Sequence, residues 1–242
     1  MNRKAFLIGS PFFKGKSGFL RGVTPDIANM KRHLFSEKGG AWDDHEIMIF
    51  ENPSRDKLLN EVRGNYDFAI IQYSGHGFEY KSTGTMISIN PYENISLHEI
   101  NSLLICPKKY YFLDCCRGIE SEELRKSTRL FSAMESDDSH NRMAYKIKYN
   151  NIIADCEDGT SIIYSCGLNE SADEDDGGLG GIFSLSYFRS ANGIKNIPID
   201  KYYSIKNIFD IAVDKMRTDY PMADQTPTMK PERRNKYFPF LI

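Results

Sequence analysis

Short apolar runs recur along the chain in a way that is typical of buried β-strands. Each run is rich in Ile, Leu, Phe or Tyr and is bounded by glycine or polar residues. Segments with apolar residues at spacings of three and four lie between them, as in amphipathic helices. This alternation predicts an α/β fold in which helices cover both faces of a mostly parallel, six-stranded sheet. The expected strands are residues 5–8, 46–50, 68–73, 110–113, 161–164 and 237–241.

Side chains that can cap a helix stand before four of the helical patterns. Ser, Thr, Asp and Asn at such positions accept a hydrogen bond from the free N–H groups of the first turn. A proline at the first helical position, or a glutamate three residues after the cap, strengthens the signal. We therefore expect helices to begin at Thr24 with Pro25, at Ser54, at Ser96 with Glu99, and at Ser204.

Length and composition describe an ordinary globular domain. The chain has 242 residues, of which 40% are apolar and 26% are charged, and no linker divides it. The net charge of −2 argues against the basic face of a nucleic-acid-binding protein. No run approaches the roughly 18 apolar residues of a membrane span. We expect one domain over residues 1–242, with neither nucleic acid nor a membrane as a partner.

The N-terminus and the cysteines favour a cytoplasmic location. The opening MNRKAFLIGS has too few apolar residues for a signal peptide, which needs roughly 7 to 15. The cysteines are odd in number and form no CxxC pair or His/Cys metal spacing, so neither a disulfide framework nor a zinc site is expected. They are Cys106, Cys115, Cys116, Cys156 and Cys166.

Two of the expected strands end in small residues around one reactive side chain. The first reads YSGHG at residues 73–77 and presents His76, and the second reads FLDCCRG at 112–118 and presents Cys116. Loops at the carboxyl ends of parallel strands share one edge of the sheet, so neighbouring strands would place the two groups across one groove. The amides of Gly77 and Cys116 could then face a carbonyl oxygen, as in a thiol protease.

These motifs resemble those of the caspase and metacaspase peptidases. CRG at 116–118 is similar to the caspase nucleophile signature, with the histidine 40 residues upstream. YSGHG, DCC and LRGVTPDI at 20–27 are more similar to metacaspases and bacterial caspase-like peptidases. SCGLNESAD, GGIFSLS and QTPTM extend the resemblance over most of the chain. It implies a three-layer caspase-like sandwich and a cysteine endopeptidase acting on proteins or peptides.

The resemblance also assigns roles to single residues. Cys116 would be the nucleophile and His76 its acid/base partner, with Cys115 as a filler. In metacaspases, residues matching Asp114, Asp26 and Ser74 line the pocket for the residue before the cut, which implies cleavage after arginine or lysine. Caspases use glutamine and arginines there and select aspartate.

Other interpretations stay open beside this one. The chain has Leu20 at the position of the early caspase arginine, but Arg21 is one place away, so aspartate specificity is an alternative. A catalytically silent interaction module is another. Metacaspases often require calcium, but the acidic run 173–176 lacks the alternating ligand pattern of a calcium loop. That run is expected to be a solvated loop. We expect no cofactor and leave calcium open.

The resemblance further divides the domain into a large portion, 1–118, and a small portion, 160–242. The polar segment 119–159 between them matches an inter-subunit loop, and 139–150 is expected to be its loosest part. Self-cleavage is expected between residues 125 and 150, with activation by a partner, a ligand or dimerisation. Bacterial relatives of this kind often serve in cell suicide or antiviral defence. The basic residues in this region are Arg125, Lys126, Arg129, Arg142, Lys146 and Lys148.

Overall fold

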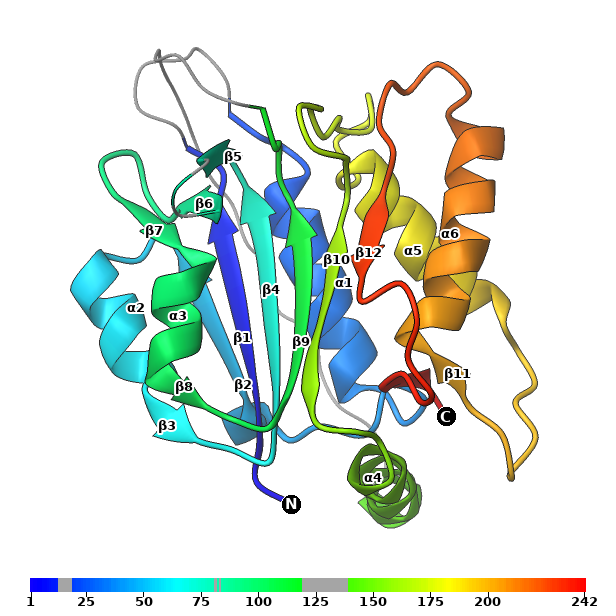
Figure 1. Ribbon diagram of the computed structural model, residues 1–242. Coiled ribbons are helices and arrows are strands. Elements are labelled where there is room, and N and C mark those ends of the chain that lie inside the picture. Colours follow the sequence, from blue (N-terminus) through cyan, green and yellow to red (C-terminus); the bar gives the residue numbers. More distant parts are fainter. Residues whose placement is uncertain (13–18, 81, 83, 119–138) are drawn as a thin grey trace.

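A six-stranded sheet forms the centre of the protein in the computed structural model, which describes residues 1–12, 19–80, 82, 84–118 and 139–242 (Figure 1). All neighbouring strands are parallel except β12, which runs antiparallel to β10. The fold prediction is therefore confirmed. In sheet order the strands are β12 (Thr228–Lys230), β10 (Gly159–Tyr164), β9 (Lys108–Asp114), β4 (Phe68–Gly75), β1 (Arg3–Ser10) and β2 (Ile47–Glu51).

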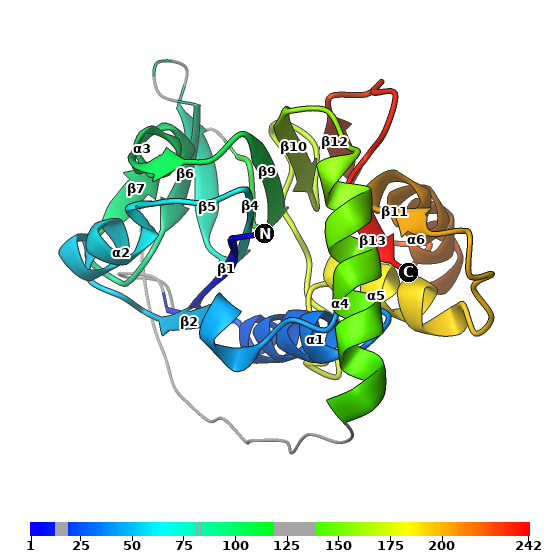
Figure 2. The ribbon, with the colours of Figure 1, turned by 90° about the horizontal axis from the view of Figure 1, so that it is seen from below.

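Helices cover both faces of this sheet and create two separate cores (Figure 2). One face packs against α1 (Val23–Phe35), α5 (Ile182–Gly193) and α6 (Ile205–Asp219). The other packs against α2 (Arg55–Val62) and α3 (Leu97–Leu103). Strands buried on both faces explain the nearly continuous apolar runs in the sequence. None of the helices in the described ranges is long and apolar enough to cross a membrane.

Three of the four predicted helix starts are correct. The hydroxyl oxygens of the three caps accept hydrogen bonds from the backbone N–H three residues later, and Glu99 completes a capping box as expected. The capping residues are Ser54, Ser96 and Ser204.

The prediction for the first helix was wrong in its cap. Helix α1 begins at Val23, with Gly22 as N-cap and no side-chain cap of its own. Glu174, far away in sequence, accepts hydrogen bonds from the N–H groups of Arg21 and Gly22. A tertiary contact to the residues just before α1 is therefore present where a local cap by Thr24 was expected.

The sixth strand of the sheet is also not the one expected. Residues 237–241 were predicted as its edge, but β13 (Pro239–Leu241) pairs with β11 (Tyr203–Ser204) in a small separate sheet. The edge is β12, where Met229 pairs with Ile163. Because β12 has only three residues and two of them are polar, its sequence carries almost no strand signal.

Two further small sheets had no counterpart in the prediction. Strands β5 (Gly77–Tyr80), β6 (Gly84–Ser88) and β7 (Asn94–Ser96) form an antiparallel sheet that starts directly after His76. Strands β3 (Gly64–Asn65) and β8 (Leu104–Ile105) pair over two residues. The β5–β7 sheet packs beside the strand ends that carry the predicted chemistry (Figure 1).

The expectation of a loose segment over residues 139–150 was wrong, because helix α4 (Ser139–Ala154) occupies it. Tyr149 and Ile153 are buried in the core, while Arg142 donates to the carbonyl oxygens of Phe35 and Trp42. The helix is anchored largely by polar side chains, so its sequence shows only a weak apolar stripe. The part of the predicted cleavage region before residue 139, with Arg125, Lys126 and Arg129, lies outside the described residues.

Candidate active site

His76 and Cys116 leave the sheet from neighbouring strands at the same edge (Figure 1). The register of β4 and β9 pairs Ser74 with Asp114, two residues before each of them. A Cβ atom at Gly77 would lie 2.7 Å from Sγ of Cys115 and 3.1 Å from the carbonyl oxygen of Cys116. The two loops are therefore in van der Waals contact, and position 77 has to be glycine for them to approach so closely.

The backbone around His76 is held by hydrogen bonds on both sides. Its carbonyl oxygen accepts from the N–H of Ser88 at 2.9 Å and from the hydroxyl of Tyr73 at 2.6 Å. Gly75 has φ +153°, and a Cβ there would lie 2.6 Å from the carbonyl oxygen of Ser10. The turn that presents the half-buried imidazole therefore depends on glycine at position 75.

The two adjacent thiols differ in their surroundings. Sγ of Cys116 is half-buried and accepts a hydrogen bond from the N–H of Ala172 at 3.4 Å, in the loop between β10 and α5. Cys115 is buried, and burial raises the pKa of its thiol well above the usual value. Because the thiolate is the reactive form, the structure supports Cys116 as the reactive thiol and Cys115 as a filler.

Asp26, Ser74 and Asp114 come together from three different elements. The Ser74 hydroxyl donates to Oδ2 of Asp26 at 2.8 Å, and the N–H of Gly181 donates to both Asp26 oxygens at 3.2 and 3.3 Å. The Ser184 hydroxyl donates to Oδ2 of Asp114. Within the described ranges, no lysine or arginine forms an ion pair with either carboxyl group.

Burial raises the cost of ionising both carboxyl groups, and Asp114 adds to that cost for Asp26. Asp26 is only 1% exposed, and burial followed by the charge of Asp114 raises its pKa well above the usual value. Burial also raises the pKa of Asp114. Two buried acids without a cation are unfavourable for the fold, and such arrangements cluster at functional sites.

Glu174 is a member of this site that the sequence analysis missed. It was placed in a solvated loop, but it is half-buried, and burial raises the pKa of its carboxyl group, with a further contribution from the charge of Asp114. The carboxylate holds the loop against the start of α1 through the N–H groups of Gly22 at 2.8 Å and Arg21 at 3.1 Å. No local signal could have found it, because its partners lie about 150 residues away.

The same region offers no evident metal centre. No three His, Cys, Asp or Glu side chains in the described ranges gather in an arrangement suited to a metal ion.

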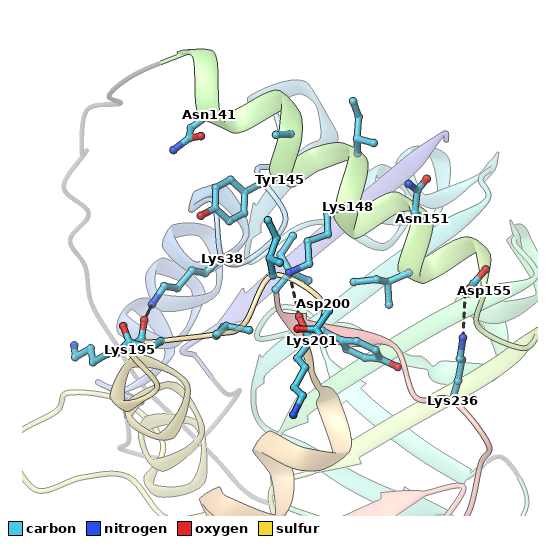
Figure 3. A pocket seen from close by; sticks show the side chains of 18 residues that line it. Lys38, Asn141, Tyr145, Lys148, Asn151, Asp155, Lys195, Asp200, Lys201 and Lys236 are labelled. Carbon is cyan, nitrogen blue, oxygen red and sulfur yellow. Dashed lines mark hydrogen bonds and ion pairs between the residues drawn. The ribbon is translucent and has the colours of Figure 1, made fainter.

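A groove of about 970 Å³ lies elsewhere, at the opposite end of the sheet, between α4 and residues 194–202 (Figure 3). Several of its lysines are already engaged: Lys38 donates to the carbonyl oxygens of Ile194 and Lys195, and Lys236 pairs with Asp155 at 3.1 Å. The groove contains none of the predicted site residues. The charged side chains lining it are Lys38, Lys148, Lys195, Lys201, Lys236, Asp155 and Asp200.

Comparisons with known proteins concern the family and the fold. The chain is similar to metacaspase-1 of Meyerozyma guilliermondii, with 34% identity over 88 residues that cover 31% of this chain and 21% of that protein. It thus matches about a fifth of that relative's length. Its fold is similar to the crystal structure of caspase-1 from Spodoptera frugiperda, with a TM-score of 0.57 and 11% identity over 94% of this chain and 85% of that one.

The family model described as the caspase domain matches residues 2–238, nearly the whole chain. The predicted family and the predicted caspase-like α/β sandwich are both confirmed. The chain belongs to the caspase-domain family.

Proposed function

We propose that the protein cleaves peptide bonds after arginine or lysine, with Cys116 as nucleophile and His76 as general acid and base. One observation carries the specificity: Asp26 and Asp114 are buried side by side without a cation among the described residues. A substrate guanidinium or ammonium group supplies the missing charge. Ser74 orients Asp26 through their 2.8 Å hydrogen bond.

The reaction follows from the thiol and the imidazole on neighbouring loops. The Cys116 thiolate attacks the carbonyl carbon of the substrate, and the charge that develops on the carbonyl oxygen is stabilised by backbone N–H groups. His76 donates a proton to the leaving amine, which leaves a thioester. His76 then takes a proton from a water molecule as the water attacks the thioester. The Cys116 thiolate leaves and the acid product is released.

The amides of Gly77 and Cys116 are the proposed donors to that oxygen. Ser88 donates to the carbonyl of His76, so the antiparallel ladder of β5 and β6 turns the Gly77 N–H away from β6. On that side it faces the loop of Cys115 and Cys116, as the close approach of position 77 indicates.

The buried acids favour basic substrates over acidic ones. Bringing an arginine side chain to two carboxylates forms charge-assisted hydrogen bonds and relieves their mutual repulsion. An aspartate side chain would add a third negative charge to the pocket. Aspartate selection would need a cation that faces the substrate, and Arg21 is instead exposed.

Fluorogenic peptides ending in arginine, lysine or aspartate test both parts of the proposal. We expect turnover of the arginine and lysine peptides alone, almost complete loss in Cys116→Ala and His76→Ala, and near-normal activity in Cys115→Ala. Full activity in Cys116→Ala would disprove the assignment of the nucleophile. A preference for the aspartate peptide would instead disprove the pocket and leave the dyad in place.

The proposal also covers substrate class, activation and cellular role. Protein or peptide substrates follow from the family, and we propose activation by a partner or by dimerisation, a cytoplasmic location and a role in defence. Size-exclusion chromatography with and without a bound peptide inhibitor would test dimerisation directly.

A further inference from the structure

The residue after the proposed nucleophile has a buried charge. Arg117 is 5% exposed, and its guanidinium carbon lies 3.9 Å from the ring centre of Tyr164, the last residue of β10. Its Nε and Nη2 atoms both lie 3.4 Å from Oε2 of Glu79. A guanidinium group cannot lose its proton at any ordinary pH, so this site always holds a charge that needs a partner.

The partners of Arg117 form a closed ring of side chains. The hydroxyl of Thr85, on β6, donates to Oε2 of Glu79 at 3.0 Å and lies 3.4 Å from the hydroxyl of Tyr164. Glu79 thus joins Arg117 on one side and Thr85 on the other, and Tyr164 closes the ring by stacking on the guanidinium. Buried networks of this kind hold their members in one arrangement.

Backbone hydrogen bonds join the same segments as this ring of side chains. The N–H of Glu79 donates to the carbonyl oxygen of Gly118 at 3.2 Å, which joins β5 to the loop after Cys116. On the other side of that loop, the N–H of Arg117 donates to the backbone carbonyl oxygen of Glu170 at 2.9 Å. The segment after the nucleophile therefore lies between β5 and the loop that follows β10.

We propose that Arg117 and Glu79 are positioning residues that set the placement of His76 relative to Cys116. The inference rests on the proposed function above. Arg117 is one residue after the thiol and Glu79 is three residues after the imidazole, so their ion pair ties the two loops together. Neither side chain needs to touch the substrate.

The physical reason is that the two reactive groups sit on separate loops. Parallel pairing of β4 with β9 fixes the strands only as far as Ser74 and Asp114, and the loops continue beyond it. A small displacement between nucleophile and base reduces the rate steeply, by as much as roughly a hundredfold for about 1 Å. The ion pair, the ring stacking and the backbone bond supply the constraint that the sheet no longer gives.

Three variants test this role: Glu79→Gln, Arg117→Gln and the double variant. We expect each single change to lower kcat for an arginine peptide roughly tenfold to a hundredfold with KM within about twofold. The double variant should be no worse than the poorer single one, because the two residues act as a unit. A purely structural role would lower the amount of folded enzyme and leave kcat per folded molecule unchanged.

A second measurement does not depend on peptide turnover. The rate at which iodoacetamide alkylates Cys116, followed by peptide mass spectrometry across pH, reports the thiolate stabilised by His76. In both Glu79→Gln and Arg117→Gln we expect the midpoint of this profile to move to higher pH, because the imidazolium is held less closely. A direct effect of the lost charge on the thiolate would instead move the two variants in opposite directions. Cys116→Ala in the peptide assay and His76→Ala in both assays decide the proposed function, so its failure is distinguishable from failure of this inference.

The chain contains a matched control at the other end of the sheet. Arg3 is buried, pairs with Glu46 at 3.0 Å and lies 4.4 Å from the ring centre of Trp42. Glu46→Gln also breaks a buried Arg–Glu pair with aromatic stacking and, in addition, the pair of Glu46 with Lys146, so it should lower the melting temperature at least as much. It should leave kcat and the alkylation midpoint unchanged.

Two results would overturn the inference. One is a folded Glu79→Gln variant with wild-type kcat and alkylation midpoint. The other is an equal loss of both in Glu46→Gln, which would show a general effect of stability. If Glu79→Gln does not fold, Thr85→Val is the deciding variant, because it removes the hydroxyl that orients Glu79. It should change kcat and the alkylation midpoint in the same direction by a smaller amount. Wild-type values in Thr85→Val would equally refute the proposal.

Discussion

Replacing Asp26 by asparagine should stabilise the protein and remove its activity toward arginine peptides. Asparagine has the same shape, can accept from the N–H of Gly181 through its oxygen, and can donate to the hydroxyl oxygen of Ser74 through its amide. It lacks only the charge. The carboxyl group of Asp26 is buried beside Asp114, with a pKa raised well above its usual value by burial and by that neighbour.

The sign of the stability change follows from this pKa. An aspartate in an unfolded chain titrates near pH 4, below its folded value, so the folded protein binds more protons in between and loses stability as the pH rises through that interval. Asparagine avoids the loss. We therefore expect Asp26→Asn to have a higher Tm than the wild type at pH 8. The gain should vanish toward pH 4.

The activity should change in the opposite direction. Removing one charged partner of a buried ion pair costs about 3 to 5 kcal/mol, so kcat/KM for an arginine peptide should fall by roughly two to three and a half orders of magnitude. Differential scanning fluorimetry at pH 4 and pH 8 and a fluorogenic assay measure the two effects. Asp44→Asn, which affects only an exposed pair with Lys31, is the control for both.

Two outcomes would refute this reasoning. Equal destabilisation of Asp26→Asn at both pH values would mean that the carboxylate is a structural acceptor and not a strained functional group. Unchanged turnover of the arginine peptide, with the thiol still reactive, would place the specificity pocket elsewhere.

Three further predictions concern pH and self-cleavage. Ser74→Ala removes a hydrogen bond that lowers the pKa of Asp26, so the rise of kcat/KM with pH for arginine peptides should shift to higher pH, and an unchanged profile would contradict this. Burial lowers the pKa of His33 to about 4, so the unfolded chain takes up this proton first, and the contribution of His33 to stability should fall by roughly 3 kcal/mol from pH 6.5 to 4. The difference in unfolding free energy between the wild type and His33→Gln, measured in urea at the two pH values, should change by that amount, and a constant difference would contradict this. If the enzyme cleaves itself, Arg142→Gln and Lys146→Gln should leave the cleavage positions found by mass spectrometry unchanged. Both residues lie in α4, where a peptide cannot adopt the extended form needed for cleavage. A fragment boundary at either residue in the wild type would show that α4 opens.

The sequence by itself determined the five parallel strands and the starts of three helices, α2, α3 and α6. Each of these features is local: an apolar run of strand length, or a serine three residues before the N–H that it caps. The same holds for His76 and Cys116, since residues that directly follow parallel strands must lie at one edge of the sheet. The fold class and the position of His76 and Cys116 at one edge of the sheet were therefore predictable from short-range pattern alone.

Only the tertiary structure decided which charged groups surround that edge. Glu174 contacts the residues just before the start of α1, and Glu79 pairs with Arg117. No spacing in the sequence predicts either contact. The edge strand β12 and the helix α4 were missed for the same reason. Strand β12 is short and helix α4 is largely polar, so both are held by contacts with residues distant along the chain. Such contacts become favourable only once the sheet has brought the partners together.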